Sequence, residues 1–505
     1  MDAMEFDTHG DADAPKAAPY VAAHETHSGV VVLAGDRAYK AKKPVQTDFL
    51  DFRTVEQREE ACTREVQLNS RIAADSYFGV AHLSGASGAA PEPIIVMRRY
   101  HDDDRLASLV KRGAPVEAVL DSIAGVLADF HDRADRGRRI SLQGKPEAIY
   151  QRWFDNFPTL HRHADTAVPA ESVRRVEDLA AAYLAGRADL FAQRIDEGCI
   201  VDGHADLLAD DIFWTDNRPV LLDCLEFSDD LRFVDRIDDA AFLAMDLEFL
   251  GRKDLGDYFL DRYAGYSGDT APSSLRDFYI AYRAAVRAKV DCVQLTQGKS
   301  GAEAAAARHL AIALNHLESG AIRLALVGGG PGTGKSTLAR KLAEKVGAVT
   351  LSTDDVRKEL HESGQLSGEP GSLGAGLYDP TNVAAVYRAI LHRAGRYLAG
   401  GQSVILDGTW RDPQVRAEAL RLAIDKHAAT TEIQCVVPDD VAADRIRSRT
   451  PGNSDATPQI AAALTAQDFE WDTAHRVDTA RPLDDCVREA QELWRAAIPT
   501  AGLTH

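Results

Sequence analysis

The most informative segment of this 505-residue chain reads Gly329-Gly330-Pro331-Gly332-Thr333-Gly334-Lys335-Ser336-Thr337. It fills every fixed position of the pattern G-x-x-x-x-G-K-S/T, in which glycine backbone N–H groups surround phosphate oxygens. An apolar run at 324–327 precedes it, and helical periodicity continues through 338–343, as a strand-loop-helix unit requires. We therefore expect all of these residues to bind a nucleotide, with Lys335 as the point charge on its phosphates and Ser336 as a ligand of Mg²⁺.

Length and composition bound the class of protein further. At about 150 residues per domain, a chain of this length contains roughly two to four domains. The 78 acidic and 58 basic side chains give a net charge of -20, which disfavours nucleic acid and anionic membranes as partners. The six cysteines show no C-x-x-C pattern, and no apolar run reaches the roughly 18 residues of a membrane span. We expect a cytoplasmic protein that acts on a small molecule.

The first half begins with a strand-rich region. Residues 1–19 lack periodicity, and we expect a mobile leader there. Residues 28–42 predict a hairpin of two β-branched strands with a Gly-Asp turn, whose exit strand is basic. A helix that contains Glu65 is expected from about Thr54 to Ile72, and a buried strand is expected at 93–99.

Acidic residues follow a mainly helical region that runs from about residue 115 to 192. The segment Ile200–Leu207 predicts a loop that includes His204-Ala205-Asp206. Residues 220–227 predict a short apolar strand ending in acid, with Asp223 within it. Carboxylates placed in this way after short strands are candidates for catalysis or for binding a hard cation.

The order of these features resembles the aminoglycoside phosphotransferase and choline kinase family, which has the protein-kinase fold. The resemblance covers roughly residues 20–300 and is strongest in the two acidic loops. It implies that Lys40 holds the α- and β-phosphates of a nucleotide, with Lys42 on the same strand face as the alternative. It also implies that Glu65 orients this lysine from the helix.

The acidic loops have implied roles in the same family. Asp206 would be the base that accepts the proton of a substrate hydroxyl, and Asp211 and Asp223 would hold Mg²⁺. Three features depart from the family pattern: His204-Ala205-Asp206 stands for His-Gly-Asp, Asp211 replaces an asparagine, and Gly29 alone remains of the phosphate-covering glycines. A carboxylate can still bind Mg²⁺. The alternative is a set of solvated acids in a domain that has lost activity.

A turn-like break at 297–301 separates the two halves, and the Ala-rich run from Ala302 to Ser319 predicts one helix leading into the next strand. We place the domain boundary near residue 318, which gives domains of 20–318 and 319–505. The expected fold class combines an α+β domain like the protein kinases with an α/β domain whose parallel sheet carries the phosphate-binding loop.

The second half carries its own acids at strand ends. Residues 349–352 predict a strand that delivers Asp354, Asp355 and Arg357 at its carboxyl end, where open α/β sheets bind ligands. This Asp-Asp-x-Arg pattern resembles small P-loop kinases such as gluconate kinases and polynucleotide 5′-hydroxyl kinases. The resemblance implies that Asp354 abstracts a hydroxyl proton and that Arg357 binds the substrate or the transferring phosphoryl group. The alternative is a capped helix at 355–360, with Asp355 as its N-cap.

Two further features complete this predicted site. Residues 404–409 predict an apolar strand ending in Asp407, which would lie near the Mg²⁺ shared with Ser336. The arginines Arg445, Arg447 and Arg449 precede the breaker-rich segment 451–455 and resemble the mobile lid of such kinases. A solvated helix face is the alternative for any one of these arginines.

Taken in order, the halves resemble actinobacterial, particularly mycobacterial, two-domain proteins that join an aminoglycoside-phosphotransferase-like half to a P-loop kinase half. The predicted function is Mg²⁺-dependent transfer of the γ-phosphoryl group of ATP or GTP to a hydroxyl of a small metabolite, with two nucleotide sites. One alternative is a regulator in which one half senses nucleotide. The other is a polynucleotide 5′-hydroxyl kinase activity of the second half, which the net charge disfavours.

Overall fold

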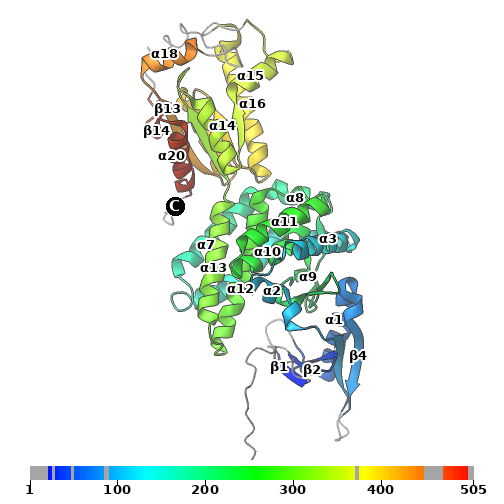
Figure 1. The fold of residues 1–505 in the computed structure, drawn as a ribbon. Helices are drawn as coiled ribbons and strands as arrows, with labels where there is room; N and C mark the ends of the chain where they lie inside the picture. The colour runs from blue at the N-terminus through cyan, green and yellow to red at the C-terminus, as the bar shows by residue number, and fades with distance from the viewer. Residues whose placement is uncertain are drawn as a thin grey trace, which may run out of the picture. The chain divides into compact units, whose positions relative to one another are not determined.

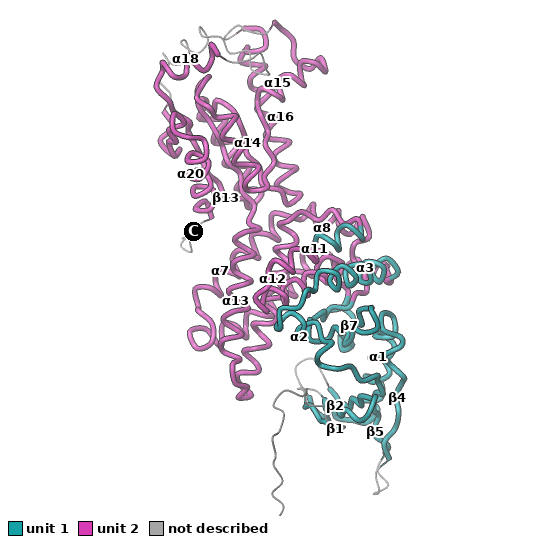
Figure 2. The backbone as a smooth tube through the Cα atoms, in the orientation of Figure 1, with its two compact units in different colours: residues 1–133, 204–232, 261–267 teal, residues 134–203, 233–260, 268–505 magenta. Residues whose placement is uncertain are grey.

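The computed structural model describes residues 21–25, 29–46, 51–84, 90–369, 375–448 and 470–498. The chain divides into two compact units (Figure 2). Unit 1 contains residues 1–133, 204–232 and 261–267, and unit 2 contains residues 134–203, 233–260 and 268–505. The expected leader at 1–19 lies outside the described residues, and the boundary expected near 318 falls within unit 2 and stays a prediction.

Unit 1 contains a five-stranded antiparallel sheet in the order β1-β2-β3-β5-β4. Its strands are β1 (Val21–Glu25), β2 (Gly29–Ala34), β3 (Arg37–Lys42), β4 (Tyr77–Leu83) and β5 (Glu92–Arg98). The expected hairpin corresponds to β2 and β3, and the expected strand at 93–99 corresponds to β5. Strands β1 and β4 form the two edges of the sheet and were not predicted from the sequence. Lys40 pairs with Ile95, so the lysine strand lies inside the sheet.

Helix α1 (Val55–Ala73) packs against β4 and β5 and begins with a capping box between Thr54 and Gln57. A buried apolar cluster joins α1, the sheet and the later pair β7 (Ile212–Thr215) and β8 (Arg218–Leu221), and it consists of Cys62, Ala73, Tyr77, Ile95, Phe213, Val220 and Leu222. The other helices that lie wholly in unit 1 are α2 (Leu106–Lys111), α3 (Glu117–Arg133) and α9 (Asp229–Arg232). Burial of this cluster fixes the acidic loops close to α1.

The helical part of unit 2 centres on the closely packed pair α12 (Ser273–Thr296) and α13 (Ala302–Ser319) (Figure 1). The structure confirms α13 with the predicted bounds. Helix α11 (Lys253–Ser267) contributes to both units. Around the central pair lie α4 (Arg138–Leu142), α5 (Pro146–Phe154), α6 (Phe157–Arg162), α7 (Ala170–Gly186), α8 (Ala188–Asp196), α10 (Arg236–Phe249) and the two-stranded sheet of β6 (Ile200–Asp202) and β9 (Phe233–Asp235).

The rest of unit 2 is a five-stranded parallel sheet in the order β11-β12-β10-β13-β14. Its strands are β10 (Arg323–Gly328), β11 (Val349–Ser352), β12 (Val404–Asp407), β13 (Ala429–Val436) and β14 (His475–Asp478). One sheet face packs against α14 (Lys335–Val346) and α20 (Leu483–Ala496), which share a buried core with the strands. Helices α16 (Pro380–Ala399) and α17 (Pro413–Asp425) contact other parts of the sheet. The predicted fold class is confirmed.

Three details of the fold bear on function. Helix α15 spans Thr353–Glu362, so a helix does cover residues 355–360, but its cap is Ser352, whose hydroxyl accepts the Asp354 N–H, and the alternative of Asp355 as the N-cap is wrong. The cap lies earlier because the strand ends directly at Ser352. All six cysteines are buried and lie within the described residues, and none of them forms a disulfide. None of the helices formed by the described residues combines the length and the apolar character needed to cross a bilayer.

Candidate functional site

The first candidate site lies in unit 1 and is called the N-terminal site; it consists of Lys40, Glu65, Asp206, Asp211 and Asp223. The Lys40 ammonium lies 2.8 Å from Glu65 Oε1 and 2.7 Å from Asp223 Oδ1. Glu65 is fully buried, so its carboxylate needs a cation. Burial would lower the pKa of Lys40, but the charges of Asp223 and Glu65 raise it well above its ordinary value. Three residues predicted from separate segments therefore meet.

The loop that carries Asp223 is held from both α1 and the sheet. The Cys224 N–H donates to the Asn69 side-chain oxygen at 2.8 Å, and the Asp223 N–H donates to the Tyr77 hydroxyl at 3.3 Å. Asn69 in turn donates to the Glu65 carbonyl at 2.9 Å. These bonds fix the position of Asp223 relative to Glu65.

The charges of Asp206 and Asp223 repel the charge of Asp211 in this site. Partial burial raises the pKa of Asp211 well above its ordinary value, and the charges of Asp223 and Asp206 act in the same direction. Partial burial also acts to raise the pKa of Asp223, but the charge and hydrogen bond of Lys40 outweigh it and lower this pKa. Converging carboxylates that disfavour one another's charge suit a divalent cation, so these residues fit Mg²⁺.

The backbone at the predicted catalytic base is strained. Ala205 has φ of 66° and Asp223 has φ of 65°, in the left-handed region that non-glycine residues rarely adopt. Ala205 stands where the resembled family has glycine, which adopts this conformation without a steric penalty. Ala205 adopts this conformation without the freedom of a glycine, and Asp206 lies near Asp211.

Glu226 is not predicted by the sequence, and Lys42 is the predicted alternative to Lys40. The Lys42 ammonium lies 2.6 Å from Glu65 Oε2 and 2.5 Å from Glu226 Oε1. The Lys42 side chain is 1% exposed, against 14% for Lys40, so Lys40 is the lysine with access to a ligand. Because side chains alternate along a strand, the spacing of Lys40 and Lys42 predicted that both lie on one face of β3. No sequence pattern identified Glu226 as a partner of Lys42.

The second candidate site, called the P-loop site, lies in unit 2 where β10 leads into α14. Gly332 and Gly334 have φ of 78° and 82°, so the loop needs glycine at both positions. The Thr333 hydroxyl donates to the Gly330 carbonyl at 2.9 Å, and the Thr479 hydroxyl donates to the Thr333 carbonyl at 2.5 Å. The loop is therefore fixed from within and from the end of β14.

Asp407, at the end of β12, is the central acid of the P-loop site. Its side chain is buried, and its Oδ1 has no hydrogen-bond partner among the described residues. Burial raises the pKa of Asp407, Asp354 and Asp355 add to the rise, and Lys335 and a hydrogen bond from Ser336 oppose it. A buried carboxylate oxygen without a partner beside Ser336 fits the Mg²⁺ that both residues were predicted to bind.

Asp354 and Arg357 are joined directly. The Arg357 guanidinium donates to Asp354 Oδ1 at 2.7 Å, and its Cζ lies 4.4 Å from the centre of the Tyr378 ring. Arg357 is 7% exposed, and its Nε has no partner among the described residues. The predicted base and the predicted substrate arginine thus form one unit on the first turns of α15.

The arginines of the expected lid differ in position. On α18 (Asp439–Arg447), Arg445 donates to the Thr479 carbonyl at 2.8 Å, and its Nη1 would lie 3.4 Å from a Cβ added at Gly334. Arg445 therefore borders the phosphate-binding loop. Arg447 instead forms an ion pair with Asp444. Arg449 and the segment 451–455 lie outside the described residues.

The loop after Asp407 is held in place by Trp410 and Tyr387, which were not predicted from the sequence as parts of the site. The Trp410 N–H donates to the Tyr387 hydroxyl at 3.3 Å, and the Thr409 hydroxyl lies 3.3 Å from the same oxygen. Trp410 is fully buried with φ of 54°. Tyr387 lies in the ordinary helical pattern of α16 and Trp410 in a polar loop, so no local pattern indicated that the two would meet.

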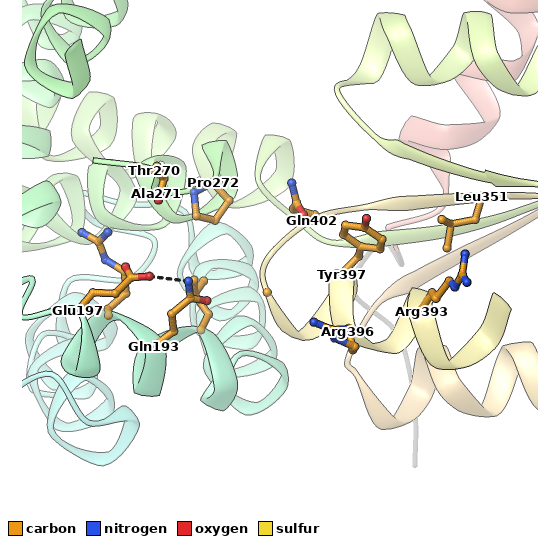
Figure 3. Close-up of a pocket in the computed structure, with 13 residues that line it drawn as sticks. Gln193, Glu197, Thr270, Ala271, Pro272, Leu351, Arg393, Arg396, Tyr397 and Gln402 are labelled. Carbon is orange, nitrogen blue, oxygen red and sulfur yellow. Dashed lines mark hydrogen bonds between the residues drawn. The ribbon is translucent and has the colours of Figure 1, made fainter. Parts of the chain in front are cut away.

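Unit 2 also contains a cavity of about 560 Å³, lined by α8 and residues 270–272 on one side and by α16 and Leu351 on the other (Figure 3). Gln193 donates to Glu197 at 2.7 Å along its wall. Its lining includes none of the predicted site residues.

Among the described residues, no group of three or more His, Cys, Asp or Glu side chains has the arrangement of a metal site. Mg²⁺ in phosphotransfer sites commonly relies on one or two carboxylates plus phosphates.

The comparison with solved structures gives partial likenesses. A choline/ethanolamine kinase family protein from Mesorhizobium loti is 15% identical, with a TM-score of 0.37, and covers 59% of this chain and 93% of that one. A gluconokinase from Sinorhizobium meliloti 1021 is 20% identical, with a TM-score of 0.27, and covers 35% of this chain and 93% of that one.

The comparison with sequences is more extensive. The family model described as AAA domain matches residues 324–470, which contain the P-loop site. The uncharacterized protein Rv2004c of Mycobacterium tuberculosis strain H37Rv is 61% identical over 498 residues, which cover 99% of this chain and 100% of the relative. The predicted resemblance to mycobacterial proteins with a P-loop domain in the second half is confirmed. The chain belongs to the same family as this mycobacterial protein.

Proposed function

We propose that this protein is a Mg²⁺- and nucleotide-dependent phosphotransferase that moves the γ-phosphoryl group of ATP or GTP to a hydroxyl of a small metabolite. One observation carries the proposal. The buried Asp407 lies beside Ser336 and Lys335 and within electrostatic reach of Asp354, and its Oδ1 has no hydrogen-bond partner in the part of the chain that the structure describes. The match of the AAA domain model to residues 324–470 supports the phosphotransferase class.

Each residue of the P-loop site has a defined task in this proposal. Lys335 and the loop N–H groups bind the phosphates, while Ser336 and Asp407 hold Mg²⁺. Bound Mg²⁺ supplies positive charge to the β- and γ-phosphates. Asp354 orients the acceptor hydroxyl and takes its proton, and Arg357 holds that carboxylate at 2.7 Å and binds the acceptor or the phosphoryl group.

The N-terminal site has the same division of tasks with different groups. Lys40 binds the α- and β-phosphates and Glu65 orients it. Asp211 and Asp223 hold Mg²⁺, and Asp206 is the base for its acceptor. The net charge of -20 favours a small acceptor over nucleic acid. The six buried cysteines, none of which forms a disulfide among the described residues, support a reducing cytoplasm as the place of action.

A regulatory role for unit 1 is the second candidate function. Lys40 forms an ion pair with Asp223, the acid proposed to hold Mg²⁺, so without nucleotide these two groups satisfy each other. Together with the strained Ala205, this pairing is compatible with a half that binds nucleotide without transferring phosphate. The two functions differ in whether Asp206 affects turnover.

The test is a screen for acceptor-stimulated ADP release by the full chain, using sugars, aminosugars, nucleosides and aminoglycosides. The proposal expects at least one acceptor to stimulate release. The stimulated rate should then be lost in Asp354→Asn if the P-loop site is responsible, or in Asp206→Asn if the N-terminal site is. If no class stimulates release while both sites bind nucleotide, the regulatory function replaces the phosphotransferase.

A further inference from the structure

The two lysines of β3 share one carboxylate in the N-terminal site. Lys40 contacts Glu65 Oε1 at 2.8 Å and Lys42 contacts Glu65 Oε2 at 2.6 Å. Both ammonium groups lie on the same face of β3 because the residues are two apart. The fully buried Glu65 therefore has a separate cation on each oxygen.

The lysines differ in what else they contact. Lys40 also lies 2.7 Å from Asp223, and its side chain is 14% exposed. Lys42 also lies 2.5 Å from Glu226 and is 1% exposed. Of the two cations, only Lys40 has solvent access through which a phosphate could reach it.

Glu226 follows Asp223 by three residues in the same loop. Lys42 lies on β3 and contacts both Glu226 in this loop and Glu65 on α1, so it links the loop to the strand and to the helix. The hydrogen bond from the Cys224 N–H to Asn69, at 2.8 Å, is a second link between the loop and α1. The result is an alternating chain of charges that runs Glu226, Lys42, Glu65, Lys40, Asp223.

We infer that Lys42 and Glu226 are positioning residues that allow Lys40 to move from Asp223 to the phosphates of a nucleotide. This inference rests on the proposed nucleotide binding by the N-terminal site. When Lys40 turns towards phosphates, Lys42 keeps the buried Glu65 paired, and a buried carboxylate left without a cation is costly. Glu226 holds Lys42 and the metal loop in place while Asp223 becomes available to Mg²⁺.

The test uses the full chain carrying Lys335→Ala, which removes the phosphate charge of the P-loop site. Binding of a non-hydrolysable ATP analogue with Mg²⁺ is measured by calorimetry. Lys42→Met should weaken binding by about tenfold, because Glu65 then retains Lys40. Lys43→Met is the matched control: it removes an adjacent lysine whose partner is Glu25, at 2.6 Å, and binding should stay unchanged.

A double-mutant cycle separates positioning from general destabilisation. In a Glu65→Gln background, Lys42→Met should weaken binding by less than about twofold, because Lys42 acts through that carboxylate. Equal losses in both backgrounds would contradict the inference. Glu226→Gln keeps a hydrogen-bonding group and gives a second variant if Lys42→Met does not fold. It should weaken binding by about threefold, and unchanged affinity would overturn the role of Glu226.

Two outcomes distinguish this inference from the proposed function. If the Lys335→Ala parent binds no nucleotide, nucleotide binding by the N-terminal site is wrong and the inference fails with it. If the parent binds and Lys42→Met binds equally well, the inference alone is wrong.

A further outcome would reverse the roles of the two lysines. If Lys42→Met abolishes binding and Lys40→Met has no effect, Lys42 is itself the lysine that binds phosphate.

Discussion

The two candidate sites are built from different parts of the chain. In the N-terminal site, charges on side chains from β3, α1 and two loops meet, as in the contacts of Lys40 with Glu65 and Asp223 at 2.8 and 2.7 Å. In the P-loop site, the cradle is backbone, held in shape by left-handed glycines such as Gly332. A site made of side-chain charges can satisfy itself without a ligand, whereas a backbone cradle leaves its N–H groups free for phosphate. The first should therefore be sensitive to charge and the second to shape.

The largest expected effect separates chemistry from binding in the P-loop site. Asp354→Asn should lower kcat by about 10²–10⁴-fold with nucleotide affinity nearly kept, because the base is not part of the cradle. ADP release and calorimetry measure the two quantities. The matched control is Asp355→Asn, which should leave kcat within about threefold, since Ser352 and not Asp355 caps α15. A loss of rate only in Asp355→Asn would move the base by one residue.

A shape change without any change of charge should disable the backbone cradle. A Cβ added at Gly332 would lie 2.5 Å from the Ala442 carbonyl, and φ of 78° is unfavourable for alanine. We expect Gly332→Ala to weaken nucleotide binding at the P-loop site by about 10²-fold or more, which corresponds to roughly 3 kcal/mol. Calorimetry on the full chain with Lys40→Met measures this site. Unchanged affinity would show that the loop adapts and that shape is not the controlling property.

The helix that leads into the P-loop strand should respond to pH. His316 of α13 lies 2.6 Å from Asp277 and 2.7 Å from Glu248. Burial opposes protonation, but these two contacts outweigh it and raise the pKa of His316 from 6.5 to about 9. Because the folded-state pKa is the higher one, this stabilisation is complete below about pH 6.5 and is lost as the pH rises through about 9.

Melting temperatures of the full chain between pH 6 and pH 10 measure this effect. The difference between the natural chain and His316→Gln should be largest at pH 6 and should vanish near pH 10. A difference that stays constant over this range would mean that His316 contributes by packing alone.

The smallest expected effect concerns strain in the N-terminal site. Ala205→Gly should stabilise the folded chain by about 1 kcal/mol, because φ of 66° favours glycine. The midpoint of the first urea-induced unfolding transition measures it. The left-handed positions Gly332 and Gly334 of the phosphate-binding loop are glycines, so a stabilisation here would sharpen the contrast between that loop and the strained loop of the N-terminal site. Destabilisation would show that the Ala205 methyl group contributes more by packing than it costs in strain.

The difference between a loop built from consecutive residues and a site built from distant segments also explains which parts of the structure the sequence could predict. The phosphate-binding loop, β11, β12 and α13 depend on consecutive residues, and their predicted positions agree with the structure. The edge strands β1 and β4 were missed because their exposed faces weaken the apolar alternation. Glu226 and Thr479 were missed because their contacts, with Lys42 and the Thr333 carbonyl, join segments distant in the chain. Tertiary pairing of that kind leaves no local pattern.

The most direct test of the account is the number of nucleotides that one chain binds. Calorimetry of the full chain with Mg²⁺ and a non-hydrolysable ATP analogue should give two sites, of which Lys335→Ala removes one and Lys40→Met the other. The double variant should bind none. A single site that disappears entirely in Lys335→Ala would contradict the account, because the lysines and carboxylates of unit 1 would then form an ion-pair network and not a nucleotide site.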